Sequence, residues 1–189
     1  MSMDPLVSRA RALWQELAAE SGAAFGTPGR PTVLVSPCSA LAPPSWVGVV
    51  TVGDGALITA PTDRAADASR SALTGLETAE LTDPATVARR LPVADTLGPA
   101  ALGYLAPEAL RPIGRTAART LCLSPQHATI RALLTEAGPS DAGESGLADV
   151  ISPVFVVRGG TEVLAAAGYE HWPRDTAHLC VLTAPDARG

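Results

Sequence analysis

Four titratable side chains in the last third of the chain could act as a general base: Glu144, Glu170, His171 and His178. A general base needs a pKa near the working pH, so a histidine, or a carboxylate whose pKa is raised by burial, suits this role. Alternate side chains of an extended strand share one face, which predicts that His178 lies on the same face as Cys180. The plainer interpretation stays open: His178 is a hydrogen-bonded strand histidine, and the other three are solvated surface groups.

The three cysteines offer little further chemistry. Cys38, Cys122 and Cys180 lie far apart and form no C-x-x-C pair, so neither a disulfide framework nor a zinc site is expected, and we expect no metal. We predict buried free thiols, with Cys180 acting as a nucleophile beside His178 as the less favoured alternative. The segment Gly143–Leu147 fails the G-x-S-x-G pattern of hydrolases because Leu147 stands where glycine is required.

Composition narrows the classes of partner. The net charge is −5, and the 14 basic residues are all arginines scattered along the chain, which disfavours a nucleic-acid partner. No apolar run approaches the roughly 18 residues of a membrane span, so no membrane partner is expected. The segment Met1–Glu20 is charged and amphipathic and lacks an apolar signal core, which predicts a cytoplasmic protein.

The first part of the chain alternates helix and strand signals. Asp4 and Pro5 supply a cap and a first-turn proline for a helix that we expect Gly22 to end. Gly53-Asp54-Gly55 predicts a hairpin turn. The further elements expected here are strands over Thr32–Val35, Trp46–Val52 and Ala56–Ala60, and helices over 61–76 and from Asp83-Pro84 to Pro92. We place a soft domain boundary after residue 115, giving units 1–115 and 116–189.

The second part has a similar mixture of elements. Ser124-Pro125 predicts the start of a helix over 126–137, and Gly138 its end. Pro139–Gly146 is predicted to be a polar loop. Arg158–Glu162 is a hairpin signal between two apolar segments. The strands expected here are Val154–Val157, Val163–Tyr169 and Ala177–Thr183.

The terminal string His178–Gly189 runs from an apolar strand through Pro185-Asp186 to Arg188-Gly189. This string resembles the cofactor strand of the GNAT superfamily of N-acetyltransferases, with Arg188 as the first residue of the loop Q/R-x-x-G-x-G/A and Gly189 as the second. The resemblance covers about residues 120–189. It implies an α/β (α+β) fold with a mixed, mostly antiparallel sheet flanked by helices, incomplete at the C-terminus. Residues 1–115 would form an α/β accessory region or a diverged half of the same design.

The resemblance also implies an activity: transfer of an acetyl group from acetyl-CoA to an amine, by direct attack in a ternary complex. The acceptor would be a small-molecule or peptide amine. The backbone of Val181, Leu182 and Thr183 would hold the pantetheine arm, and Arg188 and Gly189 would begin the pyrophosphate cradle. His178, Glu170 or Glu144 would take the proton of the amine, with Glu144 on a loop that faces the substrate.

An alternative of another class remains open. The sheet expected above would have an exposed strand edge, and such an edge favours pairing with another chain. The protein would then be a non-catalytic binding or assembly module with an acetyltransferase-like fold, and pairing of two copies would give a homodimer.

Overall fold

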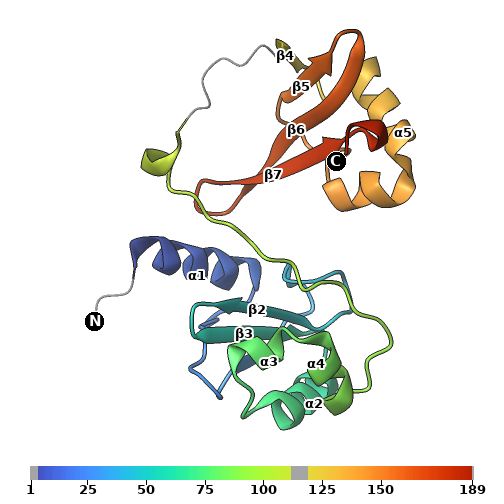
Figure 1. Cartoon of the computed structure of the whole chain (residues 1–189). Helices are drawn as coiled ribbons and strands as arrows, with labels where there is room; N and C mark the ends of the chain where they lie inside the picture. The colour runs from blue at the N-terminus through green and yellow to red at the C-terminus, as the bar shows by residue number, and fades with distance from the viewer. Residues whose placement is uncertain (1–3, 112–118, 189) are drawn as a thin grey trace. The chain divides into compact units, whose positions relative to one another are not determined.

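The computed structural model of the chain describes residues 4–111 and 119–188. It divides into two compact units, Met1–Leu110 and Arg111–Gly189, both containing helices and strands (Figure 1). The predicted mixed α/β composition is therefore confirmed, whereas the predicted boundary after residue 115 lies outside the described residues. We describe each unit by itself.

Unit 1 opens with helix α1 (Pro5–Leu17), which begins where predicted because the Asp4 carboxylate accepts a hydrogen bond from the Leu6 N–H at 2.7 Å. The predicted end at Gly22 is wrong. The carbonyl of Leu17 accepts the Ala40 N–H at 2.8 Å, and the carbonyl of Ala18 accepts the Ser36 hydroxyl at 2.6 Å. The loop after the first strand thus satisfies the last carbonyls of the helix, and no further turn is needed.

The sheet of unit 1 has the order β1-β3-β2, with β1 (Thr32–Val35) parallel to β3 (Gly55–Ala60) and β2 (Gly48–Val52) antiparallel to it. The predicted hairpin is confirmed, and β3 lies at the centre with all its residues buried. Figure 1 shows α1 on one face of this sheet and α2 (Asp63–Leu73), α3 (Thr78–Leu81) and α4 (Pro84–Arg90) on the other. The short α3 was not predicted.

A partly buried arginine joins α1 to the hairpin. The guanidinium of Arg11 donates to the carbonyl of Val52 at 2.8 Å and pairs with the Asp54 carboxylate at 2.7 Å. The Arg11 side chain is only 17% exposed, whereas Asp54 is 77% exposed. The backbone contact is therefore the part of this interaction that water screens least.

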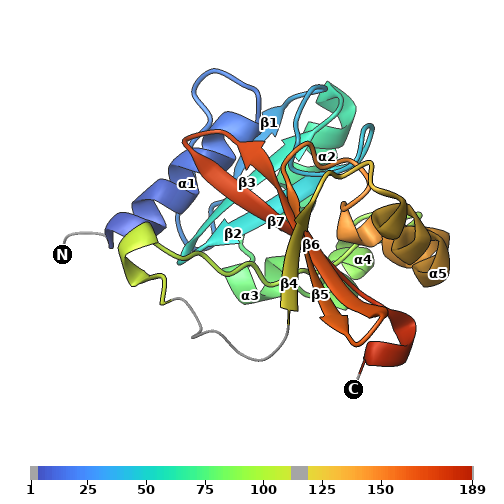
Figure 2. The same ribbon diagram turned by 90° about the horizontal axis from the view of Figure 1, so that it is seen from above.

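Unit 2 contains an antiparallel sheet of order β4-β5-β6-β7. Its strands are β4 (Arg119–Leu123), β5 (Val154–Gly159), β6 (Glu162–Trp172) and β7 (Thr176–Thr183), followed by the 3-10 turn η2 (Pro185–Ala187). Helix α5 (Ala128–Ser145) covers one face, where Ile130 and Leu133 join the buried side of the sheet in one core (Figure 2). The three strands predicted in this unit are confirmed, and β4 was not predicted as a strand.

Helix α5 differs from its prediction at both ends. The cap is His127, whose Nδ1 accepts the Thr129 N–H at 3.2 Å, and not Ser124. Gly138 does break the helix, with φ at 82°, but Pro139 occupies the first turn of a second helical segment that continues to Ser145. Proline suits a first helical turn because it has no N–H to leave unpaired. The predicted loop Pro139–Gly146 is therefore wrong, and Glu144 lies on a helix.

Candidate functional site

A shallow, open concavity of about 630 Å³ lies between the last turn of α5 and the end of β7. Its charged and polar lining comes from both elements: Asp141, Glu144 and Ser145 from α5, and Thr183 and Arg188 at and beyond the end of β7. Val181 and Leu182 complete the wall on the β7 side. The structure thus brings together Glu144, Val181, Leu182, Thr183 and Arg188, all predicted site residues; Gly189 lies outside the described residues.

Arg188 is already engaged within this concavity. Its Nε and Nη2 donate to the carbonyl of Thr183 at 3.2 and 3.1 Å, and its Nη1 pairs with Asp141 Oδ2 at 2.5 Å. These contacts fix the turn after β7 against α5. An anion that binds to Arg188 must compete with the Asp141 carboxylate, and Glu144 adds a second negative charge to the same wall.

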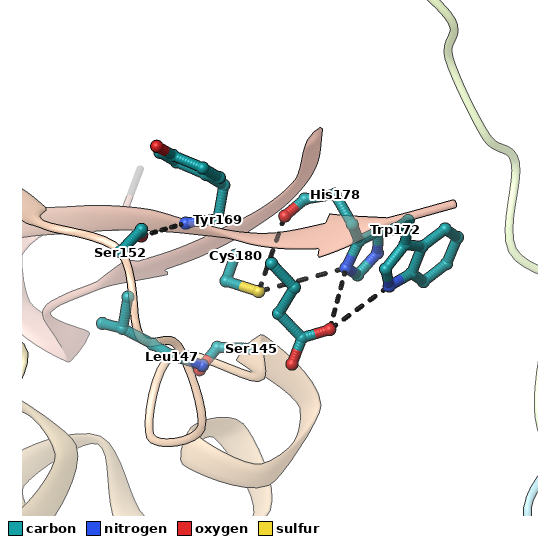
Figure 3. Close-up of polar contacts among 8 residues, drawn as sticks. Ser145, Leu147, Ser152, Tyr169, Trp172, His178 and Cys180 are labelled. Atoms are coloured by element: carbon teal, nitrogen blue, oxygen red, sulfur yellow. Dashed lines mark hydrogen bonds and ion pairs between the residues drawn. The ribbon is translucent and has the colours of Figure 1, made fainter. Parts of the chain in front are cut away.

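A second group of predicted residues lies nearer the start of β7 and on the facing part of β6. His178 pairs across the sheet with Glu170, and its Nδ1 lies 3.9 Å from Glu170 Oε2. The indole of Trp172 stacks on the imidazole with ring centroids 4.0 Å apart and donates to the same carboxylate oxygen at 3.3 Å (Figure 3). The imidazole and the carboxylate are each a little over one-third exposed. This arrangement fixes the plane of the ring and leaves part of it accessible to solvent.

Cys180 belongs to the same face of the sheet but does not complete a catalytic relay. Its Sγ lies 4.0 Å from His178 Nδ1, the nitrogen that also faces Glu170. A relay needs the nucleophile and the carboxylate on different ring nitrogens. Burial raises the pKa of the Cys180 thiol, and the carboxylates of Glu170 and Asp149 raise it further, so the thiol keeps its proton at neutral pH.

The other two cysteines and His171 lie elsewhere. Cys180 is buried as predicted, but Cys38 and Cys122 are exposed, which corrects the prediction of three buried thiols. His171 pairs with Ala177 and packs edge-on against Tyr169, with centroids 5.1 Å apart, on the face opposite His178. In Figure 3 Tyr169 and Cys180 indeed point to opposite sides of the sheet. His171 therefore stands apart from the Glu170–His178 pair.

Sequence reasoning missed two residues of these sites. Trp172 follows Glu170 by two positions on β6, so the alternation of a strand could have placed both on one face. Asp141 carried no such signal, because the segment around it was predicted as a loop. Its role depends on the second helical segment after Pro139, which brings its carboxylate to Arg188.

No family model, no curated protein and no solved structure matches this chain. Across residues 4–111 and 119–188, no helix is both long and apolar enough to cross a membrane. The same residues contain no group of three or more histidine, cysteine, aspartate or glutamate side chains placed to hold a metal ion. The cytoplasmic location stays a prediction.

Proposed function

We propose that unit 2 binds acetyl-CoA along β7 and belongs to an N-acetyltransferase that modifies a small-molecule or peptide amine. The observation that carries this proposal is the position of β7 at the edge of its sheet, with the concavity of Val181, Leu182, Thr183 and Arg188 at its end. The proposal also uses the resemblance of His178–Gly189 to the cofactor strand of the GNAT superfamily.

The edge of β7 suits the pantetheine arm. In the described sheet β7 pairs only with β6, so alternate residues direct their N–H and C=O groups away from the sheet. An extended ligand with amide groups can add to such an edge as a strand does. From His178 to Thr183 the strand rises five residues, or roughly 17 Å at about 3.4 Å per residue. This length separates the acid–base pair from Arg188 and sets the direction of the cofactor.

Arg188 would hold a phosphate of the cofactor. A guanidinium offers a planar fork of donors that matches phosphate oxygens. Because Asp141 occupies Nη1 at 2.5 Å, phosphate binding requires this ion pair to open or to be shared. The acidic wall would thus lower the affinity for acetyl-CoA. Asp141→Asn should therefore bind acetyl-CoA more tightly than the wild-type protein does.

His178 would accept the proton of the amine. Within the described part of the chain both polar neighbours of the ring lie at Nδ1, which leaves Nε2 for a substrate. The amine nitrogen attacks the thioester carbon, the proton on nitrogen passes to Nε2, and the carbon–sulfur bond breaks to release the thiolate of CoA. The thiolate then takes up a proton. The Glu170 carboxylate at 3.9 Å stabilises the imidazolium that forms.

A titration of the full chain with acetyl-CoA tests this function, read by calorimetry and by amide chemical shifts. We expect shifts in Val181–Thr183 and weaker binding by Arg188→Gln. Arg131→Gln serves as the matched control, because Arg131 is an exposed arginine of α5 that does not line the concavity. Equal affinities for the two variants, or binding unchanged by Asp141→Asn, would contradict the proposed phosphate site.

A second candidate function rests on the sheet face opposite α5. Phe155, Leu179 and Val181 are 48%, 69% and 54% exposed, and Phe155 and Val181 lie in one row through Ala167. An exposed apolar row beside an open strand edge is typical of a surface that another chain covers. We infer an assembly module, with a second copy as the simplest partner. The molar mass in solution tests this function. The wild-type protein should have the mass of two chains, and Leu179→Ser and Val181→Ser should each reduce it to the mass of one chain.

A further inference from the structure

Unit 1 contains a cavity that the proposed acetyltransferase function does not use. Its volume is about 650 Å³, and it lies among the residues before and within β2, helices α2 and α4, and the segment 91–99. This volume falls within the range of small-molecule sites in proteins. Its walls are mainly apolar, formed by Trp46, Val49, Leu73, Leu81, Val87 and Leu91. Such walls would take an apolar ligand body.

A buried hydroxyl group without a partner lines this cavity. Ser69 is 0% exposed, and its Oγ makes no hydrogen bond in the part of the chain that the structure describes. A serine within a helix commonly donates to the carbonyl four residues earlier, but here no such bond forms. Buried polar groups are nearly always paired, so an unpaired one calls for a partner that the chain does not supply. An oxygen atom of a ligand is a suitable partner.

A positive charge stands beside the same cavity. Arg64 lines it, is exposed, and forms no hydrogen bond or ion pair with another described residue. Asp95 is the opposing charge of the lining, and its carboxylate already accepts the Thr96 N–H at 2.8 Å. Arg64 also lies in the first turn of α2, where the helix dipole favours an anion. Asp63, at the first position of α2, is exposed and does not line the cavity.

We propose that this cavity binds a medium-chain organic carboxylate that carries a second oxygen atom. The carboxylate pairs with Arg64, the chain packs against the apolar walls, and the second oxygen pairs with Ser69 Oγ. The two residues are five positions apart on α2, which separates their Cα atoms by about 7.5 Å along the helix axis at 1.5 Å per residue. The same five positions turn the two side chains about 140° apart around the helix axis at 3.6 residues per turn. The bound molecule must therefore curve round α2, and the closed Ser69 hydroxyl must open to the cavity for the second oxygen to reach it.

The test uses three probes of equal length on the full chain: 8-hydroxyoctanoate, octanoate without the hydroxyl, and octane-1,8-diol without the charge. Affinities come from calorimetry and the location from amide shifts of α2 and α4. Arg64→Gln should weaken both carboxylates by about tenfold or more and leave the diol unchanged. Ser69→Ala should weaken 8-hydroxyoctanoate and the diol by about fivefold and leave octanoate unchanged.

Both substitutions are compatible with folding, since Arg64 is exposed and alanine fits where serine does. Ala68→Trp supplies a third variant, because Ala68 is an exposed residue of the lining and a large ring there should block all three probes. The proposal is overturned if 8-hydroxyoctanoate does not bind at millimolar concentration, or if Ala68→Trp leaves its affinity unchanged. Equal losses for carboxylates and diol in Arg64→Gln would overturn the assigned chemical class.

Discussion

Replacing Ser69 by alanine should stabilise the protein, against the usual effect of changing a fully buried residue. The side chain is 0% exposed and its Oγ has no partner among the described residues. An unpaired buried hydroxyl costs about 1–3 kcal/mol of stability, and removing it recovers part of this cost. Alanine also has a better helix propensity than serine by a few tenths to about 0.5 kcal/mol. We expect a gain of roughly 1.5 kcal/mol.

Ser71 is the matched control for this substitution. It lies two residues further along α2 and is exposed, so Ser71→Ala changes the helix propensity without removing a buried hydroxyl. We expect a gain of about 0.5 kcal/mol from Ser71→Ala. The difference of about 1 kcal/mol between the variants isolates the unpaired hydroxyl, and corresponds to roughly 4–8 °C in the melting temperature of a domain of about 100 residues.

Hydrogen exchange is the appropriate assay because it reports each unit separately. The amides of β3 (Gly55–Ala60) lie in the fully buried central strand of unit 1, and their exchange measures its free energy of opening. A Ser69→Ala variant no more stable than Ser71→Ala would refute the reasoning. It would mean that Oγ is paired, for example with a water molecule, and would remove the main support for the ligand site in unit 1.

Four further predictions concern packing and thiol chemistry. Arg11→Met should destabilise unit 1 by about 1.5–3 kcal/mol, because the hydrogen bonds of a charged group are lost. Asp54→Asn should change the stability little, because the Asp54 side chain is 77% exposed. Urea unfolding compares the two variants. Gly55→Ala places a Cβ 2.7 Å from the Gly26 carbonyl oxygen and should destabilise the hairpin by about 1–3 kcal/mol in thermal melts. Gly103→Ala is the neutral control, because a Cβ at this position meets nothing within 4 Å. In native protein a thiol reagent should label Cys38 and Cys122 and spare Cys180 until unfolding. The pKa of the Cys180 thiol is raised in the folded state. The stability that the protonated thiol contributes is therefore fully present below pH 9.0, the ordinary thiol pKa, and is lost as the pH rises above it. Cys180→Ala should abolish this part of the pH dependence.

Local signals predicted those elements whose ends are fixed by neighbouring residues. Asp4 caps α1 through its own carboxylate, and Gly53 turns the first hairpin with φ at 63°. The end of α1 depends instead on Ser36 and Ala40, which reach its last carbonyls from a distant loop. No local pattern encodes such contacts, and for this reason the prediction of Gly22 as the end was wrong.

In the candidate site, too, the sequence predicted what depends on local pattern and missed what depends on distant contacts. Strand alternation placed His178 and Cys180 on one face, which the structure confirms. The pairing of His178 with Glu170 depends on the register between β6 and β7, and sequence alternation fixes the face of a residue but not its partner. Glu144 was misplaced on a loop because Gly138 and Pro139 were interpreted as the end of a helix, whereas they join two helical segments.

The measurement that tests the central proposal most directly is the affinity of the full chain for acetyl-CoA, compared among the wild-type protein, Asp141→Asn and Arg188→Gln. The proposed phosphate site predicts that Asp141→Asn binds more tightly than wild type and Arg188→Gln more weakly, because the two side chains form one ion pair with opposite roles. If acetyl-CoA does not bind to any of the three proteins, or if both substitutions change the affinity in the same direction, the proposed cofactor site on β7 is wrong.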